Sequence, residues 1–168
     1  DLVSLSNSEP NQRIIQIPPA EAAFVSMNPK NGHIKTYIGG TNFLKSKFDR
    51  VRQSFPQTGS SFKPFIYASA ISRGYDASSL INDAPIIFED ENLEDYWRPE
   101  NYTKKFYGLT RLREALVQSI NIVSIKLLRN IGVENVRNDL QAFGFEKRRL
   151  PSDLSLALGS SSFSPIEM

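Results

Sequence analysis

The feature that most restricts the fold is a pair of strand-like segments joined by a compact turn near the start of the chain. Ala22–Met27 is apolar, and His33–Ile38 alternates between apolar and polar positions. The five residues between them read NPKNG, and an Asn-Gly pair suits the positive φ angles of a tight turn. This pattern predicts a β-hairpin. Because mainly helical segments follow, the sequence predicts an α+β fold with few strands of its own.

Helical character begins at Ser60 and runs to Ile71, with Pro64 in the first turn and Gly74 at the end. Two more helical regions are expected. The first is capped by Thr110, is interrupted at residues 119–121 and ends near Gly132. The second spans residues 134–143 and ends before Gly144. Residues 14–17 could add a short strand, and residues 41–59 and 75–108 are predicted to be loops. A loop as long as the second one is usually functional or belongs to an incomplete domain.

Composition excludes several kinds of chemistry. The chain has 168 residues, 20 Lys+Arg, 18 Asp+Glu and a net charge of +2, so it can bury a core and has no basic stripe for nucleic acid. It has no Cys, which excludes disulfides and thiol nucleophiles, and its single histidine, His33, lies in the predicted hairpin. Cys-based zinc sites and His-rich metal sites are therefore excluded, and nothing in the sequence implies a metal or organic cofactor. No apolar run approaches the ~20 residues of a membrane span, and no signal peptide is expected.

Ser60 and Lys63 form an S-x-x-K pattern at the start of the first predicted helix. Residues three apart share a helix face, so the hydroxyl and the amine can approach each other. A serine hydroxyl needs a base to become a nucleophile, and a lysine whose pKa is lowered by burial can serve where no histidine is near. The pattern alone is weak, because Ser60 could simply cap the helix while Lys63 extends along its surface.

The surrounding sequence strengthens this interpretation. Ser119-Ile120-Asn121 supplies an S-x-N pattern, which together with S-x-x-K belongs to a known set of active-site motifs. In order along the chain, the segments from about Ala22 to Met168 resemble the transpeptidase domain of class A penicillin-binding proteins, the bifunctional murein synthases, most of all the 1A type. The segments that carry the resemblance include SMNPKNG (26–32), NDAPI (82–86), WRPEN (97–101), LREAL (112–116), FGF (143–145) and SLALGS (155–160).

The resemblance implies the fold of penicillin-binding proteins and serine β-lactamases, with helices around an antiparallel five-stranded sheet. Only the first hairpin and the early helices of that fold have counterparts here. Residues 1–19 are expected to be a linker or tail, and residues 20–168 the N-terminal part of the domain. No K-T-G motif occurs in the sequence. We therefore expect the late strands that carry it to lie outside this chain, in a parent protein or a second fragment.

The resemblance also implies roles for individual residues. Ser60 would be acylated by the penultimate D-Ala of a peptidoglycan stem peptide, or by a β-lactam, and Lys63 would be the general base. Ser119 would pass a proton to the leaving nitrogen, and Asn121 would bind the substrate amide and Lys63. Trp97 would line the cleft, or else anchor a loop. The acyl group would then pass to an amine on a neighbouring strand.

Alternatives remain open at this point. The same fold serves β-lactamases and D,D-carboxypeptidases, and the chain alone could be an inert piece without the missing strands. Asp83 and Glu100 could be an acid–base pair, although loop roles are expected for both. By the same resemblance, the parent would carry a glycosyltransferase domain and a membrane anchor and work on the periplasmic side of the bacterial inner membrane.

Overall fold

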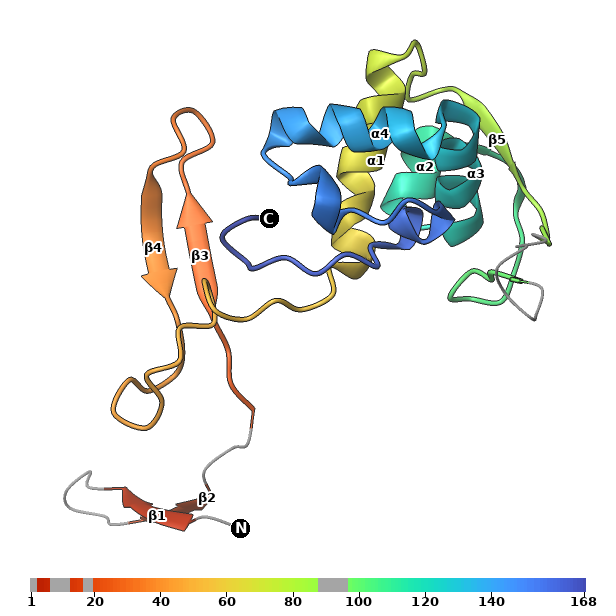
Figure 1. Ribbon diagram of the computed structural model, residues 1–168. Helices are drawn as coiled ribbons and strands as arrows, with labels where there is room; N and C mark the ends of the chain where they lie inside the picture. The colour runs from red at the N-terminus through yellow and green to blue at the C-terminus, as the bar shows by residue number, and fades with distance from the viewer. Residues whose placement is uncertain (1–2, 7–12, 17–19, 88–96) are drawn as a thin grey trace. The chain divides into compact units, whose positions relative to one another are not determined.

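A computed structural model describes residues 3–6, 13–16, 20–87 and 97–168 (Figure 1). The chain divides into two compact units. The first comprises residues up to 55 together with 164–166 and 168, and the second comprises residues 56–163 together with 167. Among the described helices, none has both the length and the apolar character needed to cross a membrane.

The first unit contains two antiparallel strand pairs. β1 (Val3–Ser6) pairs with β2 (Arg13–Gln16), so the short strand expected near residue 14 is present and has a partner. β3 (Phe24–Met27) pairs with β4 (Ile34–Ile38), which confirms the predicted hairpin. In its turn, the Asn28 amide donates to the His33 carbonyl and Gly32 has a φ of +70°. His33 is exposed beside this turn.

The second unit is mainly helical and holds every candidate site residue. Its helices, some of them 3-10, are η1 (Gly59–Phe62), α1 (Lys63–Ser72), α2 (Leu112–Val117), α3 (Asn121–Ile131), α4 (Val133–Leu140), η2 (Gln141–Phe143), η3 (Lys147–Arg149) and η4 (Leu154–Leu158). α1 packs against α3 and α4 (Figure 1). α3 is the central element, because seven of its eleven residues are buried.

The predicted helix from Ser60 is two elements, a 3-10 turn followed by α1. Pro64 is the second residue of α1, where a missing N–H costs little. At the other end, Gly74 has a φ of +91°, and the amides of Gly74 and Tyr75 donate to the carbonyls of Ile71 and Ala70. This is the glycine-terminated helix end that the sequence predicted.

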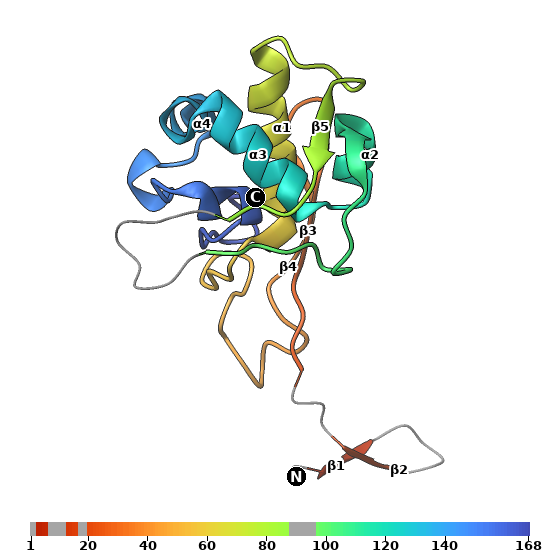
Figure 2. The same cartoon turned by 90° about the vertical axis from the view of Figure 1, so that its right-hand side faces the viewer.

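The expected cap at Thr110 is wrong. Thr110 lies in β6 (Gly108–Arg111), which pairs antiparallel with β5 (Leu80–Asp83), and its hydroxyl donates to the Gly108 carbonyl. The loop expected over residues 75–108 is also wrong in part, because β5 lies within it. β5 alternates exposed and buried residues and buries Asp83 where an apolar residue is usual. Figure 2 shows β5 beside α3.

An aromatic cluster anchors the start of α1. The fully buried Phe62 ring lies 5.3 Å from that of Phe145 and is stacked on that of Phe163 at 6.2 Å, centroid to centroid. Phe145 and Phe163 are themselves 4.8 Å apart, and Phe65 joins the cluster at 4.9 Å from Phe145. Aromatic pairs at such distances add to the stability already gained from burial. Phe62 lies between Ser61 and Lys63, so the cluster fixes the turn that carries Ser60.

Candidate active site

Ser60 lies in η1, exposed to solvent, one turn before the buried part of α1. Its carbonyl accepts a hydrogen bond from the Lys63 amide, which places the two residues on the same side of the turn. Among the residues that the structure describes, no hydrogen bond engages the Ser60 hydroxyl. The neighbouring Ser61 differs, because its hydroxyl donates to the Thr58 carbonyl at 2.5 Å. Of the two adjacent serines, Ser60 therefore has the available hydroxyl.

Lys63 is buried, with 1% of its surface exposed, and its ammonium meets three acceptors. Nζ donates to the Ser119 carbonyl at 2.7 Å, to the Ser119 hydroxyl at 3.0 Å and to the Asn121 Oδ1 at 2.8 Å. Burial, which disfavours the charged form, lowers the pKa of Lys63 to about 8. An amine with this pKa is available as a base at near-neutral pH, unlike an exposed lysine.

The break predicted at residues 119–121 is present and brings Ser119 to Lys63. α2 ends at Val117, the Ile120 amide still donates to the Ala115 carbonyl, and α3 begins at Asn121. Ser119 has a φ of +54°, a conformation that is uncommon for a residue other than glycine. In this conformation both its carbonyl and its hydroxyl accept from Lys63. Such backbone outliers are typical of functional sites.

The three acceptors also define where a proton can move. A lysine ammonium has three N–H donors and no acceptor, so the charged form of Lys63 is fully satisfied here. The neutral amine has two N–H donors and one lone pair. Of its three partners, only the Ser119 hydroxyl can reverse and donate to that lone pair. The cluster can thus exchange a proton between Lys63 and Ser119 without moving a heavy atom.

The turn carrying Ser60 is held by a segment about a hundred residues later, an arrangement that the sequence did not predict. The amides of Thr58 and Gly59 donate to the carbonyls of Ser161 and Gly159, both at 2.9 Å, and Gln57 forms a bridge with Ser162. Gly159 has a φ of +70°, and a Cβ on it would lie 1.9 Å from the Gly59 carbonyl oxygen. Only glycine fits at this close approach.

The remaining candidate residues, Trp97, Asp83 and Glu100, lie in different surroundings. Trp97 is half-buried in the second unit, and its role in the cleft stays a prediction. Asp83 is fully buried and accepts from the Asn101 side chain, whereas Glu100 offers its carbonyl to the Asn121 Nδ2 at 3.0 Å. Glu100 makes this contact through its backbone carbonyl and not through its carboxylate. Among the described residues, no group of His, Cys, Asp and Glu is placed to hold a metal ion.

Comparison with known proteins identifies the family of this chain. Residues 22–164 match the family model of the penicillin binding protein transpeptidase domain. The chain therefore belongs to the penicillin-binding transpeptidase family. Among its relatives, penicillin-binding protein 1A of Pseudomonas aeruginosa is 47% identical over 156 residues, which cover 93% of this chain and 19% of the relative. The Escherichia coli protein of the same name is 39% identical over 92% of this chain and 18% of its own length.

Solved structures show the same fold. The crystal structure of penicillin-binding protein 1A from Haemophilus influenzae superimposes with a TM-score of 0.88 at 39% identity, covering 96% of this chain and 24% of the other. An imipenem acyl-enzyme complex of penicillin-binding protein A from Mycobacterium tuberculosis has a TM-score of 0.59 at 20% identity, covering 71% of this chain and 32% of the other. The chain spans about a fifth of the length of the curated relatives it matches.

Proposed function

We propose that this chain provides the nucleophile and the proton-transfer groups of a serine D,D-transpeptidase that cross-links peptidoglycan stem peptides. The observation that carries the proposal is the buried Lys63 amine, held by Ser119 and Asn121 one turn from an exposed Ser60 hydroxyl. A base near the nucleophile that is itself oriented by a third group is a usual arrangement for an activated serine.

In the proposed acylation step, neutral Lys63 removes the proton from Ser60 Oγ as that oxygen attacks the carbonyl carbon of the penultimate D-Ala. The C–N bond to the terminal D-Ala then breaks, and the leaving nitrogen receives a proton through the Ser119 hydroxyl, which Lys63 replenishes. Catalytic hydrogen bonds are often formed only when substrate is present, so an unbonded Ser60 hydroxyl is compatible with this role. The Asn121 side chain orients Lys63 and binds the substrate amide.

The acyl group then passes to an amine of a second stem peptide, and Ser60 Oγ recovers a proton. A β-lactam takes the place of the D-Ala-D-Ala substrate in the first step. Its amide bond breaks in the same way, but the leaving nitrogen stays attached, so the acyl-enzyme persists. The acyl-enzyme described for the Mycobacterium tuberculosis relative supports β-lactams as ligands of this site.

We further propose that residues 20–168 are the N-terminal part of the domain and that later strands with a K-T-G motif complete the oxyanion-binding side. The absence of that motif from the sequence and the short coverage of the relatives support this division. In this proposal the complete protein also carries a glycosyltransferase domain and a membrane anchor and acts on the periplasmic side of the inner membrane.

The test is labelling with a fluorescent penicillin, followed by intact-mass measurement. It compares the 168-residue chain with a protein that contains the complete domain. The complete protein is expected to gain one adduct, and Ser60→Ala to lose it. Ser61→Ala is the matched control, because it removes an adjacent hydroxyl that is already bonded to Thr58, and it should label normally. No adduct in the complete protein would overturn the proposal, and rapid loss of the adduct by hydrolysis would identify a β-lactamase or carboxypeptidase instead.

A further inference from the structure

A buried carboxylate and a buried side-chain amide lie next to the first residues of α3. Asp83, at the end of β5, has no exposed surface, and Asn101 is 4% exposed. The Asn101 Nδ2 donates to both carboxylate oxygens of Asp83 at 2.9 Å and to the Lys105 carbonyl at 2.9 Å. The Tyr107 amide also donates to Asp83. A buried carboxylate is expensive unless hydrogen-bonded, so these contacts fix the pair in one arrangement.

Asn101 in turn caps α3. Its Oδ1 accepts from the backbone amides of Asn121 at 3.0 Å and Ile122 at 3.1 Å, the first two residues of that helix. The residue at the usual capping position, Ile120, has no side-chain acceptor to offer. The carbonyl and amino groups of Asn101 are thus both fully used. Any rotation of its side chain would leave buried donors of α3 without partners.

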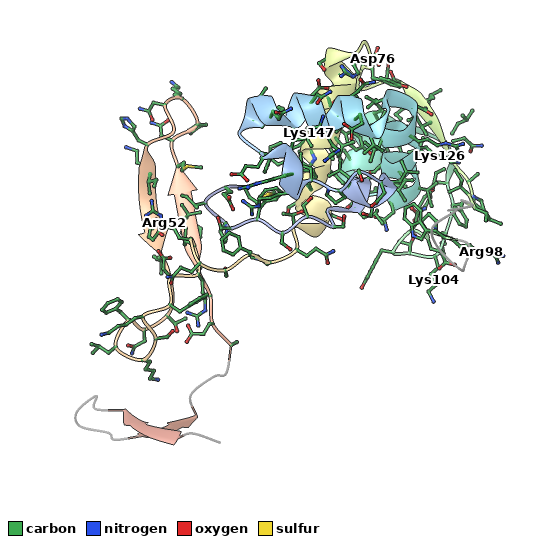
Figure 3. The ribbon with its side chains drawn as sticks, in the orientation of Figure 1. Arg52, Asp76, Arg98, Lys104, Lys126 and Lys147 are labelled. Carbon is green, nitrogen blue, oxygen red and sulfur yellow. The ribbon has the colours of Figure 1, made fainter. Side chains whose placement is uncertain are left out.

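The same end of β5 is tied to α3 a second time. Lys126 (labelled in Figure 3) extends from α3, and its Nζ donates to the carbonyls of Asn82 at 2.8 Å and Ala84 at 3.0 Å. These carbonyls flank Asp83 on both sides. The position of the Asp83 carboxylate relative to α3 is therefore fixed through the backbone as well as through Asn101.

The capped residue is also the one that holds the candidate base. The Asn121 backbone amide donates to the Asn101 Oδ1, and the Asn121 Nδ2 donates to the Glu100 carbonyl. The Asn121 Oδ1 accepts from the Lys63 Nζ. A continuous series of hydrogen bonds thus connects Asp83, Asn101, Asn121 and Lys63. We propose that Asp83 and Asn101 are positioning residues of the transpeptidase, which set the orientation of Asn121 and through it the Lys63 amine. This inference rests on the proposed function of the Ser60 site.

A purely structural role would predict something different. If the pair served only to stabilise α3, its removal would lower the melting temperature and leave the chemistry of the folded fraction unchanged. A positioning role predicts a slower acylation rate constant in protein that is still folded, with little change in the initial non-covalent binding of the β-lactam. Misplacement of a catalytic group by about 1 Å can cost on the order of 100-fold in rate.

The experiment measures the acylation rate constant and the non-covalent dissociation constant separately, in a protein with the complete domain, by following fluorescent penicillin over a range of concentrations. Asn101→Ala is expected to slow acylation about 10- to 100-fold. Asn135→Ala is the matched control, since the Asn135 Nδ2 donates to the Ile131 carbonyl at the opposite end of α3. Asn135 lies in α4, so this variant removes an asparagine contact to α3 that is far from Asn121, and it should acylate within about twofold of the unsubstituted protein.

A charge exchange provides the second arm. Asn101→Asp places two carboxylates in contact, which should slow acylation strongly. Adding Asp83→Asn restores a donor opposite the new carboxylate and should recover part of the rate. If Asn101→Ala does not fold, Asp83→Asn is tested in its place, because this substitution keeps the size of the side chain. Asp83→Asn alone should also slow acylation.

The possible results separate the two proposals. If the unsubstituted complete protein is not acylated, the proposed function fails. If it is acylated and folded Asn101→Ala or Asp83→Asn is acylated at an unchanged rate, the positioning role fails while the proposed function stands. Loss of β-lactam affinity with an unchanged acylation rate constant would also overturn the positioning role, because it would make the pair part of the binding surface.

Discussion

The contact between Gly159 and Gly59 allows a prediction from distances alone. In Gly159→Ala the new Cβ would lie 1.9 Å from the Gly59 carbonyl oxygen, 2.6 Å from its carbon and 2.7 Å from its nitrogen. Real Cβ contacts essentially never fall below 3.0 Å, so the two segments must separate by about 1 Å. Both partners are backbone, so no side-chain rotation can relieve the overlap. The displaced residue directly precedes Ser60.

We expect Gly159→Ala to lower the rate of acylation by a β-lactam about 100-fold, the cost of a 1 Å misplacement of a reacting group. Its positive φ of +70° adds a backbone penalty of roughly 1–2 kcal/mol to the free energy of folding. The assay is the time course of fluorescent-penicillin labelling in a protein with the complete domain, with the melting temperature measured in parallel.

Gly74→Ala separates strain from displacement. Gly74 also has a positive φ, +91°, but a Cβ there would meet nothing within 4 Å. This variant should lose stability and keep its acylation rate. If Gly159→Ala is folded and acylated within threefold of the unsubstituted protein, or if Gly74→Ala is impaired as severely, the close approach does not position Ser60.

Three further predictions follow from the site and its support. First, burial lowers the pKa of Lys63 to about 8, and the neutral amine is the reactive form in the proposed mechanism. The acylation rate should therefore rise nearly tenfold from pH 6 to 7 and change less than twofold between pH 8 and 9. A rate that stays flat over this pH range in a stopped-flow assay would contradict the base role. Second, Asn121→Ala should slow acylation by at least 10-fold while labelling still depends on Ser60, because the Lys63 amine loses the Asn121 Oδ1 that orients it. An unchanged rate in the same assay would exclude an orienting role. Third, Phe62→Ala should lower the free energy of unfolding by about 3–5 kcal/mol in urea titration, whereas Phe43→Ala, at a side chain that is 71% exposed, should change it by less than about 0.5 kcal/mol; similar losses in both would show that the aromatic cluster does not stabilise the turn.

The elements that could be predicted from the sequence are those with a local signature. The hairpin was evident from alternation and an Asn-Gly turn, and the interruption of the helix at residues 119–121 was evident from its polar residues. The pair β5 and β6 was missed because its buried positions include two polar residues. The Asp83 carboxylate accepts from Asn101, which lies 18 residues later, and the Thr110 hydroxyl donates to the Gly108 carbonyl in its own strand. A pattern based on hydrophobicity cannot register such positions.

The site itself was only partly predictable. S-x-x-K identifies a serine and a lysine on one face, but the meeting of Lys63 with Ser119 and Asn121 spans 56 and 58 residues and was expected only from a family resemblance. The structure brings these side chains together, whereas their catalytic roles remain proposals. The contacts of Asn101 with α3 and of Gly159 with Gly59 have no periodic or motif signature, because each depends on where two distant segments meet.

The pairing of residues 57–59 with residues 159–162 has a consequence for biosynthesis. A nascent chain that has just exposed Ser60 has not yet made the segment that fixes the turn around it. At synthesis rates of roughly 5–20 residues per second, the missing hundred residues take about 5–20 s to appear. During that interval Ser60 lacks the hydrogen bonds from residues 159–161 that hold its turn. Under the proposed function, a newly made molecule should therefore not react with β-lactams until the later segment has emerged and docked.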